Sequence, residues 1–206
     1  MLPEPEGAPE VHRTGHAFTD RIVAGSAILI SLCSLGLAIH HGHTMERLVE
    51  ANSRPFLEFE SSNADVRADG TFLPELTLRL ANPGAGAARI GRFAIALDGR
   101  PVAGWPELVK ALAADAAAHG VAVDAAAPKG QFTYSTVTHS YLKAGSEQVI
   151  LRWPRTEANA AFWAYADEAR QHDRISLEAC YCSIFDECWL ASSRVFRPQP
   201  VAACPD

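Results

Sequence analysis

The residues best suited to chemistry in this chain are four cysteines that cluster late in the sequence. Cys180, Cys182, Cys188 and Cys204 follow the spacing C-x-C-x5-C-x15-C, which lacks the paired C-x2-C knuckles of zinc ribbons. The sequence has no C-x-x-C pair, so thiol oxidoreductase chemistry is not indicated. An even number of cysteines in an exported domain predicts disulfides, whereas the same set in a reducing compartment would indicate metal binding. We expect disulfides.

The strand that carries the first two of these cysteines predicts how the four pair. Residues Ile175–Ser183 alternate as a strand, so Cys180 and Cys182 share one face. A five-residue hairpin loop then sets Cys182 opposite Cys188, where Cα atoms lie roughly 4.5–5.5 Å apart, within the range of a disulfide. Cys180 remains for Cys204. Four cysteines allow three connectivities, and this is the one that we expect.

Three histidines lie close together just beyond an apolar stretch. His40, His41 and His43 could share a zinc or copper ion, or titrate as a pH sensor. A tight metal site needs a third or fourth ligand fixed by structure, and none is evident in the sequence. We interpret these imidazoles as amphipathic rings at a membrane interface, and we expect neither a metal nor a cofactor.

Candidates for a catalytic site are few. His119 and His139 have Asp115, Ser135 and Ser140 nearby in the sequence, but no nucleophile-elbow motif surrounds them. His119 falls in the last turn of an expected helix, where an imidazole complements the helix dipole. The sequence contains no phosphate-binding glycine loop and no His-Glu-x-x-His motif. We expect no catalytic activity.

The elements that position these residues begin with an uncharged stretch of 18 residues, Ile22–Ile39, which includes the fifth cysteine. As a helix it rises about 27 Å, close to the roughly 30 Å hydrocarbon core of a bilayer. The rival interpretation is a signal peptide cleaved near Gly36-Leu37-Ala38, but the preceding segment is long and acidic for one. We expect a disordered tail over residues 1–21 and a transmembrane helix over residues 22–41.

The charges beside this span indicate its orientation. Arg21 lies directly against the span, whereas the first arginine on the far side, Arg47, lies eight residues beyond Ile39. The positive-inside rule then favours a cytoplasmic amino terminus, and disulfides in the domain that follows agree with it. We expect a single-pass protein of the bacterial inner membrane whose carboxyl-terminal domain is periplasmic.

A stripe of small residues runs along the span at alternating spacings of three and four. His41, Met45 and Leu48 continue the same stripe. Small residues let two helix backbones approach closely in lipid, although other small residues of the span lie off the stripe. We expect the stripe to pair this helix with a second copy or with another protein. It consists of Ala24, Ala27, Ser31, Ser34 and Ala38.

Beyond a helical stalk over residues 42–54, the sequence alternates as short strands. The clearest strand places Leu76, Leu78 and Leu80 on one face. Helices are expected at Pro106–His119 and Thr156–Gln171. Short strands with turns between them indicate an antiparallel sandwich rather than a parallel sheet. The expected strands are residues 56–61, 75–82, 92–99, Phe132–Thr138, Gln148–Trp153, Ile175–Ser183 and Cys188–Phe196.

These elements predict a mainly β fold with two inserted helices. We expect an immunoglobulin-like antiparallel β-sandwich over residues 55–198, preceded by one transmembrane helix and followed by a tail over residues 199–206. The 206 residues, 48% hydrophobic and 20% charged, suit one globular domain with an appendage. A net charge of −6 excludes a nucleic-acid partner, since nothing offsets phosphate repulsion. The use of only three lysines and much alanine suggests a GC-rich bacterial genome.

Short motifs give the chain a resemblance to known proteins. A membrane helix is followed by Ser53-Arg54-Pro55, a strand, the run Asn82-Pro83-Gly84-Ala85-Gly86-Ala87-Ala88 and a Cys-Tyr-Cys-Ser hairpin. In these features the chain resembles a group of uncharacterised bacterial single-pass membrane proteins. The resemblance implies membrane attachment and a β-rich domain outside the cytoplasm, and it transfers no catalytic residue.

These observations predict a binding or scaffolding module, anchored in the membrane and belonging to an envelope assembly. One alternative is a single-pass envelope sensor that signals through its transmembrane helix. Another is a membrane-anchored hydrolase, which would need a pocket that joins His119 or His139 to a carboxylate and a nucleophile. The lipid bilayer is a partner in all three.

Overall fold

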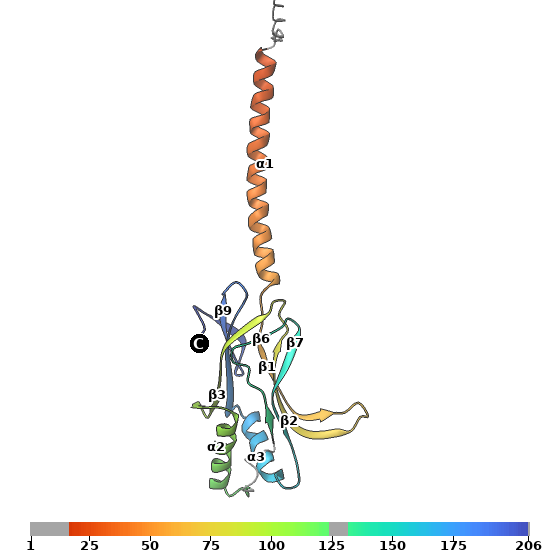
Figure 1. The fold of residues 1–206 in the computed structure, drawn as a ribbon, viewed down its shortest axis with the longest axis vertical. Coiled ribbons are helices and arrows are strands. Elements are labelled where there is room, and N and C mark those ends of the chain that lie inside the picture. The colour runs from red at the N-terminus through yellow and green to blue at the C-terminus, as the bar shows by residue number, and fades with distance from the viewer. Residues whose placement is uncertain (1–16, 124–131, 206) are drawn as a thin grey trace, which may run out of the picture. The chain divides into compact units, whose positions relative to one another are not determined.

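The computed structural model describes residues 17–123 and 132–205. The chain divides after Leu48 into two compact units. Helix α1 (Ala17–Asn52) makes up the described part of the first unit and continues to the start of the second (Figure 1). Residues Phe18–Asn52 are long and apolar enough to span a membrane, and the hydrophobic part of the helix is not buried within the protein.

The observed helix is longer than the predicted span. It begins at Ala17, so the last residues of the segment expected as a tail are helical, while residues 1–16 lie outside the described part. It also continues without interruption through the predicted stalk to Asn52. Pro55 follows three residues later, and a proline ends a helix because it has no backbone N–H to donate.

The second unit is a mixed α/β domain with two antiparallel sheets. One sheet has the order β1-β2-β7-β5, and the other has the order β10-β9-β8-β3-β4, with β6 also paired to β3. Helices α2 and α3 lie beside each other at one end of this domain (Figure 1). The elements are β1 (Glu58–Val66), β2 (Phe72–Asn82), β3 (Ala88–Leu97), β4 (Arg100–Val102), α2 (Trp105–Ala118), β5 (Thr133–Tyr134), β6 (Ser140–Leu142), β7 (Ser146–Pro154), α3 (Ala160–Gln171), β8 (Ile175–Cys182), β9 (Cys188–Ser192) and β10 (Val195–Val201).

Both sheets and both helices contribute to one hydrophobic core. The alternation predicted for β2 holds, because Leu76, Leu78 and Leu80 are all buried there. Side chains of β3 and β8, such as Ile95 and Leu177, meet them from the second sheet. The helices close the same core with their apolar faces, through Leu108, Val109, Leu112, Phe162 and Ala166.

Two element boundaries differ from the sequence prediction for reasons that lie in single side chains. Helix α3 begins at Ala160 rather than near Thr156, and residues 157–159 form a turn before it. Side chains hold this turn: Thr156 N donates to Asn159 Oδ1 over 2.7 Å, and Asn159 N donates to Thr156 Oγ1 over 3.2 Å. The strand predicted over Phe132–Thr138 is limited to Thr133–Tyr134, and His139, with a φ of 56°, turns the chain soon afterwards.

The last predicted strand is in fact two strands. A tight turn after Ser192 separates β9 from β10, and Ser192 pairs with Val195 across it. Strand β10 then runs to Val201, so part of the segment expected as a carboxyl-terminal tail belongs to the sheet. Its prolines are compatible with this place, because β10 is an edge strand and needs hydrogen bonds on one side only.

Candidate functional site

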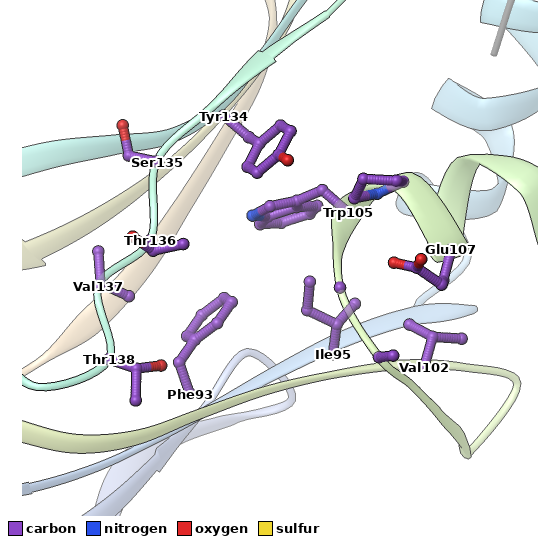
Figure 2. A pocket seen from close by; sticks show the side chains of 13 residues that line it. Phe93, Ile95, Val102, Trp105, Glu107, Tyr134, Ser135, Thr136, Val137 and Thr138 are labelled. Atoms are coloured by element: carbon purple, nitrogen blue, oxygen red, sulfur yellow. The ribbon is translucent and has the colours of Figure 1, made fainter. Parts of the chain in front are cut away.

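A cavity of about 400 Å³ lies between the edges of the two sheets. One wall is formed by β3, β4 and the first turn of α2, and the other by Tyr134–Thr138. Figure 2 shows the rings of Phe93, Trp105 and Tyr134 around the same open space. We call this cavity the aromatic groove.

Local sequence explains why Trp105 forms the floor of the groove. Trp105 is the first residue of α2, and Pro106 follows it in the first turn, where proline is favoured. The ring of Trp105 packs against that of Phe93 with centroids 6.0 Å apart, and only 3% of Trp105 is exposed. Tyr134, in contrast, is 49% exposed and stands at the rim. The groove therefore has a fixed apolar floor and one accessible aromatic ring.

The polar groups of the groove are few and lie around its margin. Glu107, in the first turn of α2, is the acidic residue of the lining. The hydroxyl groups come from Ser135, Thr136 and Thr138. Such a set, mostly apolar with a small number of polar groups, is typical of ligand-binding sites. A single carboxylate favours a ligand with a positive charge.

Two sheet edges border the groove. Strand β5 is the end strand of one sheet, and β4 is at the end of the other. Ser135 N still donates to Ile150 O of β7 over 3.2 Å, but the next residues, Thr136–Thr138, leave the ladder. Their backbone therefore runs along the groove outside any sheet, with Val137 buried and its oxygen accepting the Ser140 hydroxyl, while Thr136 and Thr138 are exposed.

The structure brings His119 to a carboxylate, and also to the hydroxyl of Tyr165, which lies 3.3 Å from His119 Nδ1. His119 Nδ1 lies 2.8 Å from the backbone oxygen of Asp115 and 3.6 Å from its Oδ1. The hydroxyl of Tyr165 donates to Asp115 Oδ2 over 2.6 Å, and Arg174 Nη2 donates to the same oxygen over 2.6 Å while also binding Asp98. The Tyr165 hydrogen bond, followed by that of Arg174, lowers the pKa of Asp115. This carboxylate is thus held by structural partners that join α2 to α3 and β8.

The other residues named as catalytic candidates are not brought together. His139 is exposed in its turn, and within residues 17–123 and 132–205 it makes no hydrogen bond or ion pair. The hydroxyl of Ser140 donates to the backbone oxygen of Val137, and Ser135 belongs to the aromatic groove. These contacts therefore place Ser135 and Ser140 near Val137, and they join neither serine to His119 or His139 within the described residues.

The four late cysteines form two disulfides. Cys182 bonds to Cys188 across the β8–β9 hairpin, with Cα atoms 4.0 Å apart, and Cys180 bonds to Cys204 with Cα atoms 5.5 Å apart. This is the connectivity expected from the hairpin. Cys33 in α1 has a free thiol.

Two of the short motifs noted in the sequence, Ser53-Arg54-Pro55 and the run that begins at Asn82, lie against each other, and Gly86 N donates to Arg54 O over 3.3 Å. Asn82 is at the centre of this contact. This side chain is fully buried. Its Oδ1 accepts hydrogen bonds from Phe56 N (3.1 Å) and Gly84 N (3.2 Å). Its Nδ2 lies within hydrogen-bonding distance of the backbone oxygens of Gly86 (2.8 Å), Leu142 (3.1 Å) and Lys143 (3.2 Å). One amide therefore ties together the segment after α1, the β2–β3 loop and the β6–β7 turn.

Glycines allow these segments to touch. A Cβ added to Gly86 would lie 1.7 Å from the Ser53 oxygen, and one added to Gly84 would lie 2.4 Å from Phe56 N. On the other side of the same segment, the Arg54 guanidinium lies 4.9 Å from the ring centroid of Trp189, a cation–π contact. The segment that follows α1 is therefore held on the domain by backbone contacts as well as by side chains.

The residues predicted on α1 lie on one exposed helix. The stripe Ala24, Ala27, Ser31, Ser34 and Ala38 is exposed along it, and Ser31 Oγ donates to Ala27 O over 2.8 Å. His43 Nδ1 lies 3.7 Å from Glu46 Oε2, and the rings of His40 and His41 are 6.3 Å apart. In the described part of the chain, metal-ligand spacing is found at Cys182, Cys188 and Cys204, whose sulfurs are engaged in disulfides, and not at these histidines.

Sequence reasoning did not identify the aromatic groove. It placed Phe93 on a core face with Ile95, and it took Tyr134 as part of a longer strand. The available signal was local: an aromatic residue directly before a helix-starting proline, as at Trp105, stands where a sheet edge meets a helix. Comparison with protein-family models, curated proteins and solved structures finds no match to this chain.

Proposed function

We propose that this protein is a membrane-anchored binding module, and that the aromatic groove holds an extended peptide segment of a partner protein. The observation that carries the proposal is the groove itself: about 400 Å³ lined by aromatic and aliphatic side chains, with one ring exposed at its rim. A volume of this size is within the range of ligand pockets and can take a few side chains of a peptide.

The borders of the groove favour an extended peptide over a compact small molecule. A peptide can pair its backbone with a sheet edge and place alternate side chains in an adjacent pocket. The end strand β5 supplies such an edge, and its Tyr134 lines the groove together with Trp105. Glu107 at the margin favours a lysine or arginine in the bound segment, because a carboxylate attracts a cation most strongly where solvent is partly excluded.

We also propose that the domain has an immunoglobulin-like topology. In that fold, one sheet has the strand order A-B-E-D and the other contains G-F-C. The observed order β1-β2-β7-β5 corresponds to A-B-E-D, and β9-β8-β3 corresponds to G-F-C. On this assignment β4 and β6 are additions beside strand C, and the aromatic groove lies between strand D and these additions.

The proposed location is the bacterial inner membrane, with the amino terminus in the cytoplasm and the domain in the periplasm. The apolar length of α1 and the two disulfides support it. A reporter enzyme that works only outside the cytoplasm, fused after Asp206, should be active. Activity of a cytoplasmic reporter alone at this position would reject the orientation.

Binding by the aromatic groove can be tested with the full chain in lipid nanodiscs and a random peptide library. We expect selected peptides to bind with affinities in the micromolar range, as is common for short linear segments, and to shift the fluorescence of Trp105. Tyr134→Ala should weaken binding about tenfold or more, because the accessible ring supplies much of the contact. Tyr141→Ala is the matched control, since Tyr141 is 67% exposed outside the groove. If no selected peptide depends on Tyr134 while the domain stays folded, the groove is not the binding site.

A further inference from the structure

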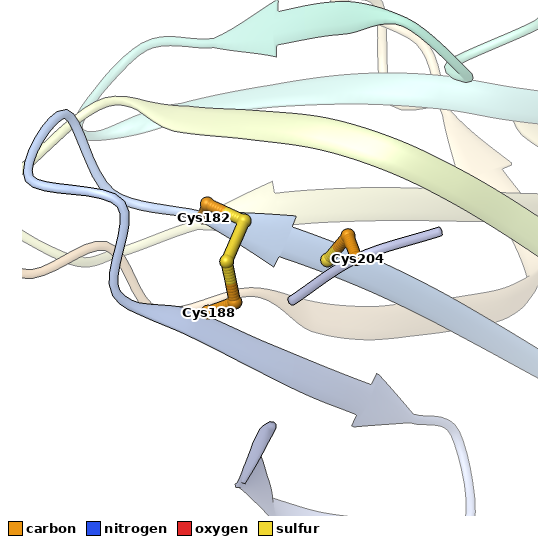
Figure 3. Close-up of side chains that lie close together, drawn as sticks. All are labelled: Cys182, Cys188 and Cys204. Carbon is orange, nitrogen blue, oxygen red and sulfur yellow. A yellow bond between two sulfur atoms is a disulfide. The ribbon is translucent and has the colours of Figure 1, made fainter. Parts of the chain in front are cut away.

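The two disulfides of the domain are in contact with each other. The sulfurs of Cys182, Cys188 and Cys204 all lie within 4.8 Å of one another, although they belong to two different bonds. Figure 3 shows Cys204 beside the Cys182–Cys188 bond. Exchange between a thiol and a disulfide requires a thiolate to reach a sulfur of the bond that it attacks. Here a third sulfur is already beside such a bond.

Cavities give access to both disulfides from solvent. One cavity of about 350 Å³ is lined by Cys182, Cys188 and Cys204, together with Arg89 and Asp186. A second cavity of about 210 Å³ opens on Cys180. One cavity therefore borders Cys180 and the other borders Cys204, and Ala203 lines both of them.

The surroundings of Cys204 place its sulfur. A Cβ added to Gly91 would lie 3.1 Å from Cys204 Cβ, so this glycine leaves room for the carboxyl-terminal segment to lie close against β3. Arg89 and Asp186, paired with each other over 2.6 Å, line the same cavity. The thiolate is the species that attacks in thiol–disulfide exchange, so the position of the Cys204 sulfur decides which bond it can reach.

We propose that these four cysteines form a thiol–disulfide exchange site that accepts electrons from a dithiol. A thiolate of the dithiol attacks the Cys180 sulfur, the Cys180–Cys204 bond breaks, and the electron pair leaves on Cys204. The second thiol of the donor then displaces Cys180. The donor becomes a disulfide and gives two electrons and two protons to the protein.

The second step takes place within the protein. The Cys204 thiolate attacks Cys182 or Cys188, a new bond to Cys204 forms, and the Cys182–Cys188 bond breaks with its electron pair on the displaced sulfur, which takes a proton. This step is redox-neutral. Reduction at one bond therefore changes which cysteines are joined, and Cys204 passes from Cys180 to Cys182 or Cys188.

Two variants that lose the same bond test this proposal, both made in the full chain with Cys33→Ala to remove the fifth thiol. Cys180→Ser leaves a thiol on Cys204, which is beside the hairpin disulfide. Cys204→Ser leaves it on Cys180, which is outside the group of three neighbouring sulfurs. After purification in detergent, exchange is stopped with acid, free thiols are alkylated, and the unreduced protein is digested and analysed by mass spectrometry. Cleavage after Tyr181, Glu187 and Arg194 separates the cysteines.

In Cys180→Ser, we expect alkylation to be shared among Cys204, Cys182 and Cys188, with disulfide-linked peptides that contain Cys204. In Cys204→Ser, we expect alkylation at Cys180 and an intact Cys182–Cys188 bond. The fraction of exchanged disulfide should differ about tenfold or more between the variants, because a neighbouring group has a high effective concentration. Alkylation of Cys204 alone in Cys180→Ser would overturn the proposal. Equal exchange in both variants would also overturn it, because misfolding from the shared lost bond would then be the cause.

Discussion

Replacing Asn82 with alanine removes the amide that joins three segments of the domain, and we expect it to be one of the most damaging single changes in this chain. The side chain is fully buried. Its five polar neighbours, two N–H donors and three carbonyl oxygens, lie between 2.8 and 3.2 Å from it. Alanine leaves these groups without a partner in a place that water reaches poorly.

The size of the loss follows from the number of bonds. Oδ1 accepts two hydrogen bonds, and the two hydrogens of Nδ2 are shared among three oxygens, so about four net bonds are lost. Each contributes about 1 kcal/mol to stability. Asn82→Ala should therefore lower the free energy of unfolding by about 3–5 kcal/mol, a large share of the roughly 5–15 kcal/mol of an ordinary domain.

Urea unfolding of the full chain in detergent, followed by tryptophan fluorescence, measures this loss. All four tryptophans, at positions 105, 153, 163 and 189, lie in the second unit, so the signal reports on that unit alone. Asn63→Ala is the control, because Asn63 makes one side-chain hydrogen bond, to Asp167 over 3.0 Å, and should cost about 1 kcal/mol. A loss below about 1 kcal/mol for Asn82→Ala would refute the reasoning, since unpaired buried groups cost more than this.

Three further changes have defined outcomes. Gly86→Ala should destabilise the domain by about 3 kcal/mol in the same assay, because the added Cβ would collide with the backbone of Ser53. Gly104→Ala is the control and should cost less than about 1 kcal/mol, because the nearest atom to its added Cβ would be 3.4 Å away; equal losses would contradict the close packing at Gly86. Arg174→Gln should destabilise the domain at pH 6 and have less effect at pH 3. Arg174 lowers the pKa of Asp98 and Asp115, so the stability that these ion pairs contribute is complete above about pH 5 and is lost as the two carboxylates protonate. A loss of stability that does not change with pH would argue against this. Ser34→Leu should weaken association of the transmembrane helix in membranes, measured by energy transfer between labelled copies, whereas Leu32→Ala, outside the small-residue stripe, should not. The same result for both variants would show that the stripe is not the interface.

The sequence predicted the elements whose signals are local. The alternation of Leu76, Leu78 and Leu80 is enough to identify β2, and Pro106 is enough to locate the start of α2. The hairpin disulfide is similarly local, since its cysteines are six residues apart. Strands β4 and β6 were missed because each is three residues long and exists only by pairing with β3.

The sites could not be predicted because they depend on contacts between distant segments. The aromatic groove joins Phe93 to Tyr134, and these residues meet only because two sheets share a core. Nothing in the local sequence of Gly86 indicates that its backbone lies against Ser53. In the same way, the predicted pairing of Cys204 with Cys180 did not show that Cys204 also lies beside the other disulfide.

The spacing of the paired cysteines sets the order in which the bonds become possible during synthesis. Cys182 and Cys188 are six residues apart, whereas Cys180 and Cys204 are 24 residues apart. When the chain crosses the membrane with its amino-terminal residues first, Cys180 reaches an oxidising compartment before its partner Cys204. During that time Cys180 competes with Cys182 and Cys188 for a bond within the hairpin. Cys204 then arrives beside Cys182 and Cys188, the position from which a thiolate can attack a wrongly joined sulfur. If the proposed exchange takes place, the last strand and the segment after it would also correct wrongly paired cysteines during oxidative folding.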